Sequence, residues 1–255
     1  MELPPNGFKA ALKTGRSQIG LWCSLPGSYA AELLAGAGFD WLLFDTEHSL
    51  GDVLTVLPQL QAAAPYPVAP VVRPATNDTV LIKRFLDIGA QTLLIPYIQT
   101  PDQAARAVAA MRYPPHGIRG VSALTRATRF GRAEDYARRA EEELCLLVQI
   151  ETGDALDRLE AIASVEGVDG IFIGPADLAA SLGHPGADGH PAVVAAVEDA
   201  VTRIVALGKP AGILTPDPDF ARRCVELGTT FTAVGVDAGI LARTSEKLAA
   251  SFRVQ

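Results

Sequence analysis

The sequence predicts an α/β protein built as a closed (β/α)8 TIM barrel. Eight short apolar runs recur along the chain with helical segments between them, which is the pattern of parallel strands joined by crossover helices. Most runs are nearly continuous rather than alternating, as expected of strands covered on both faces. The length of 255 residues is close to that of a typical barrel. The expected strands span residues 18–24, 41–48, 69–74, 92–98, 144–151, 170–177, 210–214 and 231–237.

The connecting segments carry helix start and stop signals. Ser28 is a favourable N-cap, and Gly89 ends the helical segment that follows Thr76. No linker or low-complexity tract interrupts the pattern, so we expect one domain over residues 1–255. An open, doubly wound sheet is the competing architecture, but no GxGxxG or GxxxxGK[ST] motif is present and eight strands favour the barrel. The expected helices span residues 28–37, 80–89, 102–111, 133–142, 154–164, 191–207, 217–227 and 238–251.

Composition excludes several functional classes. A net charge of −7 disfavours nucleic-acid binding. No apolar run reaches the roughly 18 residues of a membrane span, and the N-terminus lacks the apolar core of a secretory signal. The three cysteines are far apart and form no CxxC pair, which fits a reducing, cytoplasmic compartment. We therefore expect small-molecule chemistry without nucleic-acid or membrane partners.

Polar residues gather at the ends of the expected strands, where barrel enzymes place their active sites. Glu151 ends the fifth run and Asp177 the sixth, so their carboxylates should converge at one rim. Converging like charges require a cation or a shared proton, and two oxygen ligands with open positions suit Mg²⁺, Mn²⁺ or Co²⁺. The competing interpretation is that one or both acids form an ion pair with a neighbouring Arg or Lys.

Two further strand-end residues are candidates for catalysis. His48 could act as a general base near neutral pH, or be a structural or surface histidine. Arg73 could hold a carboxylate or an enolate oxygen, or form an ion pair with Asp45 or Glu47. A Schiff-base mechanism would need a lysine at a strand end. Lys209 alone borders a strand, at its start, which is the wrong face.

Several of these segments resemble the HpcH/HpaI aldolase family. They are AELLAGAGFDWLLFDTEH, PVVRP, YPPHGIRGV, LVQIET and VDGIFIGPADL, within a match that runs nearly the whole chain. The resemblance implies a metal-dependent (class II) pyruvate aldolase with a divalent cation and no organic cofactor. It also implies a homo-hexamer, a dimer of trimers, in which the last helix packs on a neighbouring subunit. The implied reaction is reversible cleavage of a 4-hydroxy-2-oxo acid, such as 4-hydroxy-2-oxoheptanedioate, to pyruvate and an aldehyde, such as succinic semialdehyde.

The resemblance also assigns roles to single residues. Glu151 and Asp177 match the metal ligands, His48 the base and Arg73 the transition-state stabiliser. Asp87 matches an acid that raises the basicity of the histidine, although its place near a helix end points to the opposite barrel face. The matching substrate-binding positions are Arg73, Gln149, Gly174, Pro175, Ala176 and Asp177.

Other functions stay open at this point. The loops after the D-T-E-H and G-P-A-D motifs are individual, so the aldehyde partner is undetermined, and a 2-keto-3-deoxy sugar acid is an alternative substrate. A CoA-thioester or citrate-type lyase is a second alternative, with Arg126, Arg129 and Arg132 available for phosphates. Phosphoenolpyruvate chemistry and a non-catalytic, metabolite-binding barrel are the remaining ones.

Overall fold

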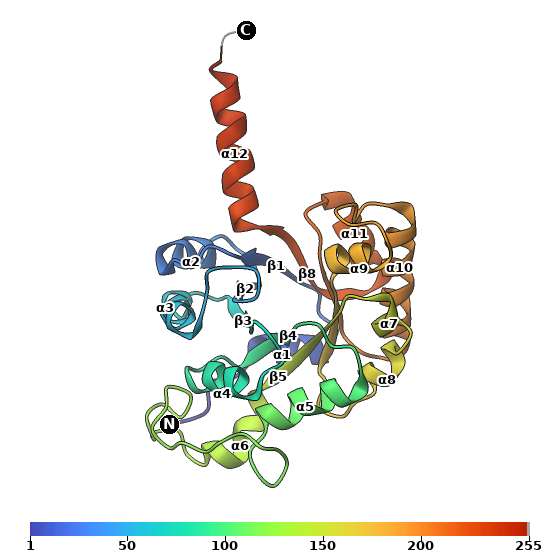
Figure 1. Cartoon of the computed structure of the whole chain (residues 1–255). Coiled ribbons are helices and arrows are strands. Elements are labelled where there is room, and N and C mark those ends of the chain that lie inside the picture. Colours follow the sequence, from blue (N-terminus) through green and yellow to red (C-terminus); the bar gives the residue numbers. More distant parts are fainter. Residues whose placement is uncertain (254–255) are drawn as a thin grey trace.

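The computed structural model describes residues 1–253 and contains a closed barrel of eight parallel strands, paired in chain order from β1 to β8 (Figure 1). The predicted barrel is confirmed, and each strand overlaps its predicted run. The strands are β1 (Gln18–Cys23), β2 (Trp41–Asp45), β3 (Ala69–Arg73), β4 (Thr92–Ile95), β5 (Cys145–Ile150), β6 (Gly170–Ile173), β7 (Ala211–Leu214) and β8 (Thr229–Val236).

The expected helices are also present. The expected helix over residues 154–164 is divided into two short ones, α7 and α8. These confirmed helices are α2 (Ser28–Ala35), α4 (Thr79–Asp87), α5 (Pro101–Met111), α6 (Tyr136–Glu143), α7 (Gly153–Leu156), α8 (Leu159–Ala163), α10 (Pro191–Ala206), α11 (Pro218–Leu227) and α12 (Asp237–Ser251).

Three helices were missed by the sequence prediction: α1 (Gly7–Lys13), α3 (Val53–Ala63) and α9 (Pro175–Ser181). In α3, Asp52 forms a capping box with Thr55, but Pro58 lies inside the helix and obscures the pattern. The extension of the sixth strand to Asp177 was wrong. The strand ends at Ile173, and Pro175 opens α9 at a position where a missing N–H costs nothing.

Helix α1 closes the amino-terminal end of the barrel. Phe8 packs edge-on against the rings of Trp41 and Phe231, at centroid distances of 5.9 and 5.8 Å. These side chains belong to an apolar cluster inside the barrel. The space around them is full, because a Cβ at Gly20 or Gly212 would stand 2.1 Å from a ring carbon of Trp41 or Phe231. The barrel is therefore a packed core, and a ligand can enter only at its ends.

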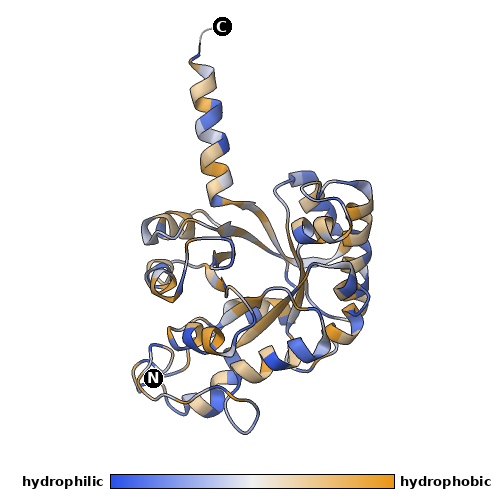
Figure 2. Ribbon diagram, in the orientation of Figure 1, coloured by the Kyte–Doolittle hydropathy of each residue, from blue (hydrophilic) through white to orange (hydrophobic). Residues whose placement is uncertain are grey.

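A second, larger apolar cluster lies between the strands and the outer helices. Figure 2 shows the strands and the inward helix faces as predominantly apolar, with hydrophilic residues outside. Across residues 1–253, no helix combines the length and apolarity that crossing a bilayer requires. The three cysteines are buried and unpaired, as expected of inert thiols, and burial raises their pKa values.

Helix α12 projects away from the barrel (Figure 1). Within Asp237–Ser251, Asp237 alone is buried. Its carboxylate accepts hydrogen bonds from the backbone N–H groups of Ser24 and Leu25, at 2.9 and 3.1 Å, which ties the start of the helix to the loop after β1. Beyond that point Ile240, Leu241 and Leu248 are 50–62% exposed. The projecting part of α12 therefore has an apolar face without a partner among residues 1–253.

Candidate active site

Arg73 and Asp45 form a buried pair at the carboxyl-terminal end of the barrel. They are direct neighbours in the register of β2 and β3. Arg73 Nε and Nη2 each donate to an oxygen of Asp45 at 2.8 Å, and the guanidinium lies 4.7 Å from the ring centroid of Trp22. Burial opposes ionisation of Asp45, but its hydrogen bonds and the charge of Arg73 outweigh it, so the pKa of this carboxyl is lowered. The ion pair left open by the sequence is present.

Glu47 forms a second ion pair with Arg73. Its Oε2 lies 2.6 Å from Arg73 Nη1 and 3.8 Å from Nε2 of His48. Burial raises the pKa of Glu47, against the opposing charges of Arg73 and His48, and the negative charges of Asp45 and Asp177 raise it further. The imidazole of His48 is 65% exposed. His48 therefore borders the site from the solvent side and can exchange protons with water.

Glu151 follows β5 and is 2% exposed. Its Oε1 accepts a hydrogen bond from the backbone N–H of Tyr97 at 2.8 Å, and its Oε2 accepts one from the amide of Gln149. Burial and the nearby charges of Glu47 and Asp177 raise the pKa of Glu151 to about 7, despite Tyr97 and Arg73. Tyr97 is held at a left-handed φ of 53°, a conformation that is costly outside glycine and recurs at functional sites.

The turn from β6 into α9 brings Asp177 to the same rim. Ile150 and Ile173 pair across β5 and β6, so Glu151 and Gly174 lie at matching ends of neighbouring strands. A Cβ at Gly174 would stand 2.5 Å from Glu151 Oε2 and 2.8 Å from Nε2 of Gln149. Only glycine therefore leaves room for this carboxylate. Asp177 is exposed in the first turn of α9, where the helix dipole favours negative charge.

The charges at this rim are unbalanced. Four carboxylates gather here, from Asp45, Glu47, Glu151 and Asp177, and Arg73 already pairs with the first two. A divalent cation beside Glu151 and Asp177 would remove the repulsion that raises the pKa of Glu151. Among residues 1–253, no three His, Cys, Asp or Glu side chains form a closed metal cluster. The carboxylates of Glu151 and Asp177 are themselves oxygen donors of the kind that Mg²⁺ or Mn²⁺ prefers.

Asp87 lies elsewhere. It ends α4, shortly before β4 begins, which places it toward the amino-terminal end of the barrel. Its Oδ1 accepts a hydrogen bond from Nη2 of the buried Arg119 at 2.9 Å, and Arg119 stacks over Tyr113. Within one chain, the structure does not bring Asp87 to His48. The position of Asp87 at the opposite barrel end agrees with its place in the sequence, and its role at His48 stays a prediction that requires a neighbouring subunit.

The sequence prediction missed two contributors to this rim. Glu47 was visible in the D-T-E-H motif but was considered only as a partner of Arg73. Nothing in the sequence identified Tyr97, because a left-handed φ at a non-glycine residue has no reliable sequence signal. Lys209 precedes β7 and donates to the carbonyl oxygen of Val168 at 2.7 Å, so this lysine lies at the opposite barrel end, as expected.

Comparison with known proteins agrees with this arrangement. The family model described as HpcH/HpaI aldolase/citrate lyase matches residues 18–244. The chain belongs to this family. A "pyruvate aldolase" of Rhizobium etli is 75% identical over 252 residues, covering 99% of both chains. A "4-hydroxy-2-oxo-heptane-1,7-dioate aldolase" of Shigella sonnei is 59% identical, covering 98% of this chain and 96% of that one.

Among solved structures, a family member from Burkholderia cenocepacia is 41% identical and superposes with a TM-score of 0.94. The match covers 98% of this chain and all of that one. The family's fold therefore extends over almost the whole of this chain.

Proposed function

We propose that this protein catalyses the reversible aldol cleavage of a 4-hydroxy-2-oxo acid to pyruvate and an aldehyde. The observation that carries the proposal is the convergence of the buried carboxylate of Glu151 with those of Glu47 and Asp177 at the rim that also holds Arg73. The names of the relatives support the reaction class, and those at 59% identity favour 4-hydroxy-2-oxoheptanedioate as substrate, with succinic semialdehyde as the aldehyde.

Glu151 and Asp177 would hold a divalent cation, Mg²⁺, Mn²⁺ or Co²⁺. When bound, the cation supplies a Lewis acid for the 2-oxo group of the substrate. Gln149, whose side-chain oxygen lies 3.5 Å from Arg73 Nη1, would orient the 2-oxo acid beside Arg73. The backbone from Gly174 through Pro175 and Ala176 to Asp177 would bind the substrate carboxylate at the start of α9.

His48 would manage the proton of the reaction. In cleavage, Nε2 of His48 takes the proton of the 4-hydroxyl group through a bridging water. The C3–C4 bond then breaks. Its electron pair forms the C2–C3 double bond while the carbonyl π pair moves onto the 2-oxo oxygen, giving the aldehyde and a pyruvate enolate. Arg73 Nη1 releases Glu47 when the substrate binds. It then donates a hydrogen bond to the 2-oxo oxygen as negative charge develops on that oxygen. Return of the proton to C3 yields pyruvate, and the reverse sequence forms the aldol.

Asp87 would contribute only from a neighbouring subunit. The exposed apolar residues of α12 support an oligomer in which this helix packs on another copy, with the family's hexamer, a dimer of trimers, as the proposed assembly. Light scattering should give a mass near six chains, and Leu248→Glu should lower it. A monomer for the unmodified protein would contradict the exchange of α12 and leave Asp87 without a role at His48.

The decisive test of the reaction measures pyruvate release from 4-hydroxy-2-oxoheptanedioate with a lactate dehydrogenase couple. Protein treated with EDTA should be inactive and should recover with Mg²⁺, Mn²⁺ or Co²⁺. Glu151→Gln should abolish recovery. Asp154→Asn should not, since Asp154 is an exposed acid three residues further along the chain. Full activity in EDTA together with borohydride trapping on pyruvate would overturn the metal-dependent mechanism.

The same assay separates the competing substrates. Faster pyruvate release from a 2-keto-3-deoxy sugar acid would reassign the aldehyde half of the substrate. Cleavage of an acyl-CoA or of citrate, without any pyruvate release from 4-hydroxy-2-oxo acids, would replace the proposed reaction altogether.

A further inference from the structure

A cavity of about 220 Å³ opens at the amino-terminal end of the barrel. Its wall includes Pro70 at the start of β3, Gln91 just before β4 and Leu144 just before β5. Glu151 and Arg73, by contrast, stand at the opposite ends of their strands. Within one chain, the cavity is therefore separate from the candidate active site.

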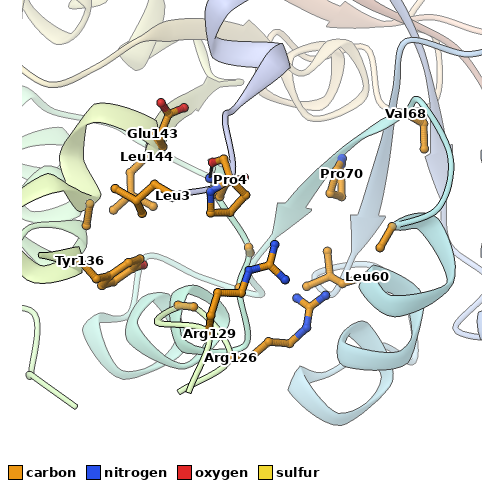
Figure 3. Close-up of a pocket in the computed structure, with 16 residues that line it drawn as sticks. Leu3, Pro4, Leu60, Val68, Pro70, Arg126, Arg129, Tyr136, Glu143 and Leu144 are labelled. Carbon is orange, nitrogen blue, oxygen red and sulfur yellow. Dashed lines mark hydrogen bonds between the residues drawn. The ribbon is translucent and has the colours of Figure 1, made fainter. Parts of the chain in front are cut away.

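Two arginines face this cavity without acidic partners. Within residues 1–253, neither Arg126 nor Arg129 forms an ion pair. Arg126 is half-buried, and its Nη1 donates to the carbonyl oxygen of Ile88 at 2.8 Å. Burial and the charge of Arg129 lower the pKa of Arg126. Figure 3 shows both guanidinium groups side by side, between Pro4 and Leu60.

The backbone makes room for one of these groups. Gly89 has a φ of +95°, and a Cβ at this position would stand 2.6 Å from Arg126 Nη1. A side chain here would thus displace the guanidinium from the cavity wall. Two adjacent like charges are costly unless an anion lies between them, and two guanidinium forks match the oxygens of a carboxylate or a phosphate.

The rest of the wall is mainly apolar. Glu143 is the one carboxylate among the lining residues. It accepts a hydrogen bond from the backbone N–H of Asn6 at 2.5 Å and lies beyond Leu3 and Pro4 from the arginines in Figure 3. A volume of about 220 Å³ is below the usual range of about 300–1,000 Å³ for ligand pockets, so the cavity suits a small ligand. The apolar part of the wall comes from Leu3, Leu60, Val68, Pro70, Tyr136 and Leu144.

We propose that this cavity binds a small organic anion, a carboxylate or a phosphate monoester. Arg126 and Arg129 hold the charged end, and the apolar body lies against Leu60 and its neighbours. The cavity joins segments that are distant in sequence: residues 3–4, α3, residues 89–91, residues 126–129 and α6. A ligand that binds only the folded chain raises its melting temperature, so binding can be measured independently of turnover.

The test uses the full-length, metal-loaded protein with three probes: benzoate, phenyl phosphate and inorganic phosphate. Calorimetry and thermal melting should detect at least one of the organic anions, with a Tm increase of about 2 °C or more at saturation. The double variant Arg126→Gln/Arg129→Gln should weaken that binding about tenfold or more. The matched control is Arg138→Gln, which removes an exposed arginine of α6 that does not line the cavity.

A second variant protects the test against misfolding of the first. Ala64→Trp keeps both arginines but places a large ring at an exposed position of the cavity wall, and it should also abolish binding of the organic anion. Unchanged affinity in Ala64→Trp or in the double variant would overturn the site. Absence of binding by both organic probes, or equally tight binding of inorganic phosphate, would overturn the proposed ligand class.

Discussion

Replacing Glu151 by glutamine measures how much the buried negative charge of Glu151 lowers the unfolding free energy. In the metal-free protein, burial and the charges of Glu47 and Asp177 raise the pKa of Glu151 from 4.5 to about 7. This shift corresponds to about 3 kcal/mol between the two protonation states. Glutamine keeps the shape of the side chain but cannot ionise. The variant therefore removes the electrostatic penalty while leaving the packing nearly unchanged.

The sign of the pH dependence follows from the direction of the shift. Between pH 4.5 and 7 the folded chain holds a proton on Glu151 that the unfolded chain has lost. The unfolding free energy of the wild type therefore falls as pH rises through this window. Relative to the wild type, Glu151→Gln should be more stable by about 3 kcal/mol at pH 8 and by about 1 kcal/mol at pH 5.

Urea denaturation in EDTA, followed by far-UV circular dichroism at equal protein concentrations, measures both differences. Adding Mg²⁺ should reverse the order at pH 8, because only the wild type gains stability from the cation. Asp154→Asn serves as the control and should respond to pH like the wild type. If Glu151→Gln and the wild type change in parallel between pH 5 and pH 8, the assigned environment of Glu151 is wrong.

Three further substitutions test the geometry of the rim and its support. Gly174→Ala should weaken Mn²⁺ binding, measured by titration, about 10-fold or more, since its Cβ would displace Glu151 and Gln149; wild-type affinity would contradict this close approach. Arg73→Ala should lower the unfolding free energy, measured by urea denaturation, by about 3 kcal/mol or more, because it leaves the charge of Asp45 buried and unpaired. Adding Asp45→Asn should recover part of that loss, and no recovery would argue against the ion pair. Asp237→Ala should cost about 2 kcal/mol by leaving the N–H groups of Ser24 and Leu25 without acceptors, and a change below about 0.5 kcal/mol would show that water replaces the carboxylate.

The architecture was readable from the sequence because its signal is local and repeated. A strand covered on both faces must be apolar at nearly every position, and eight such runs with helices between them leave few topologies. The same regularity places Glu151 and Asp177 at one rim, since the ends of neighbouring parallel strands meet there. The prediction failed where a proline weakened the local pattern. Helix α3, which contains Pro58, was not predicted, and the sixth strand was extended past Pro175 into helix α9.

The pairings within the site depended on the tertiary structure. Arg73 had two possible roles in the sequence, and only the register of β2 and β3 shows that Asp45 holds it from the neighbouring strand. The family resemblance gives Asp87 a role at His48, although its helix end already pointed to the opposite barrel face, and the structure shows that its partner in this chain is Arg119. The raised pKa of Glu151 likewise depends on the tertiary structure, because Glu47 and Asp177 come close to Glu151 from segments that follow other strands. Whether a segment forms a strand depends mainly on the residues next to it in the sequence. The charge at the active-site rim depends on distances between residues far apart in the sequence, and only the closed barrel sets those distances.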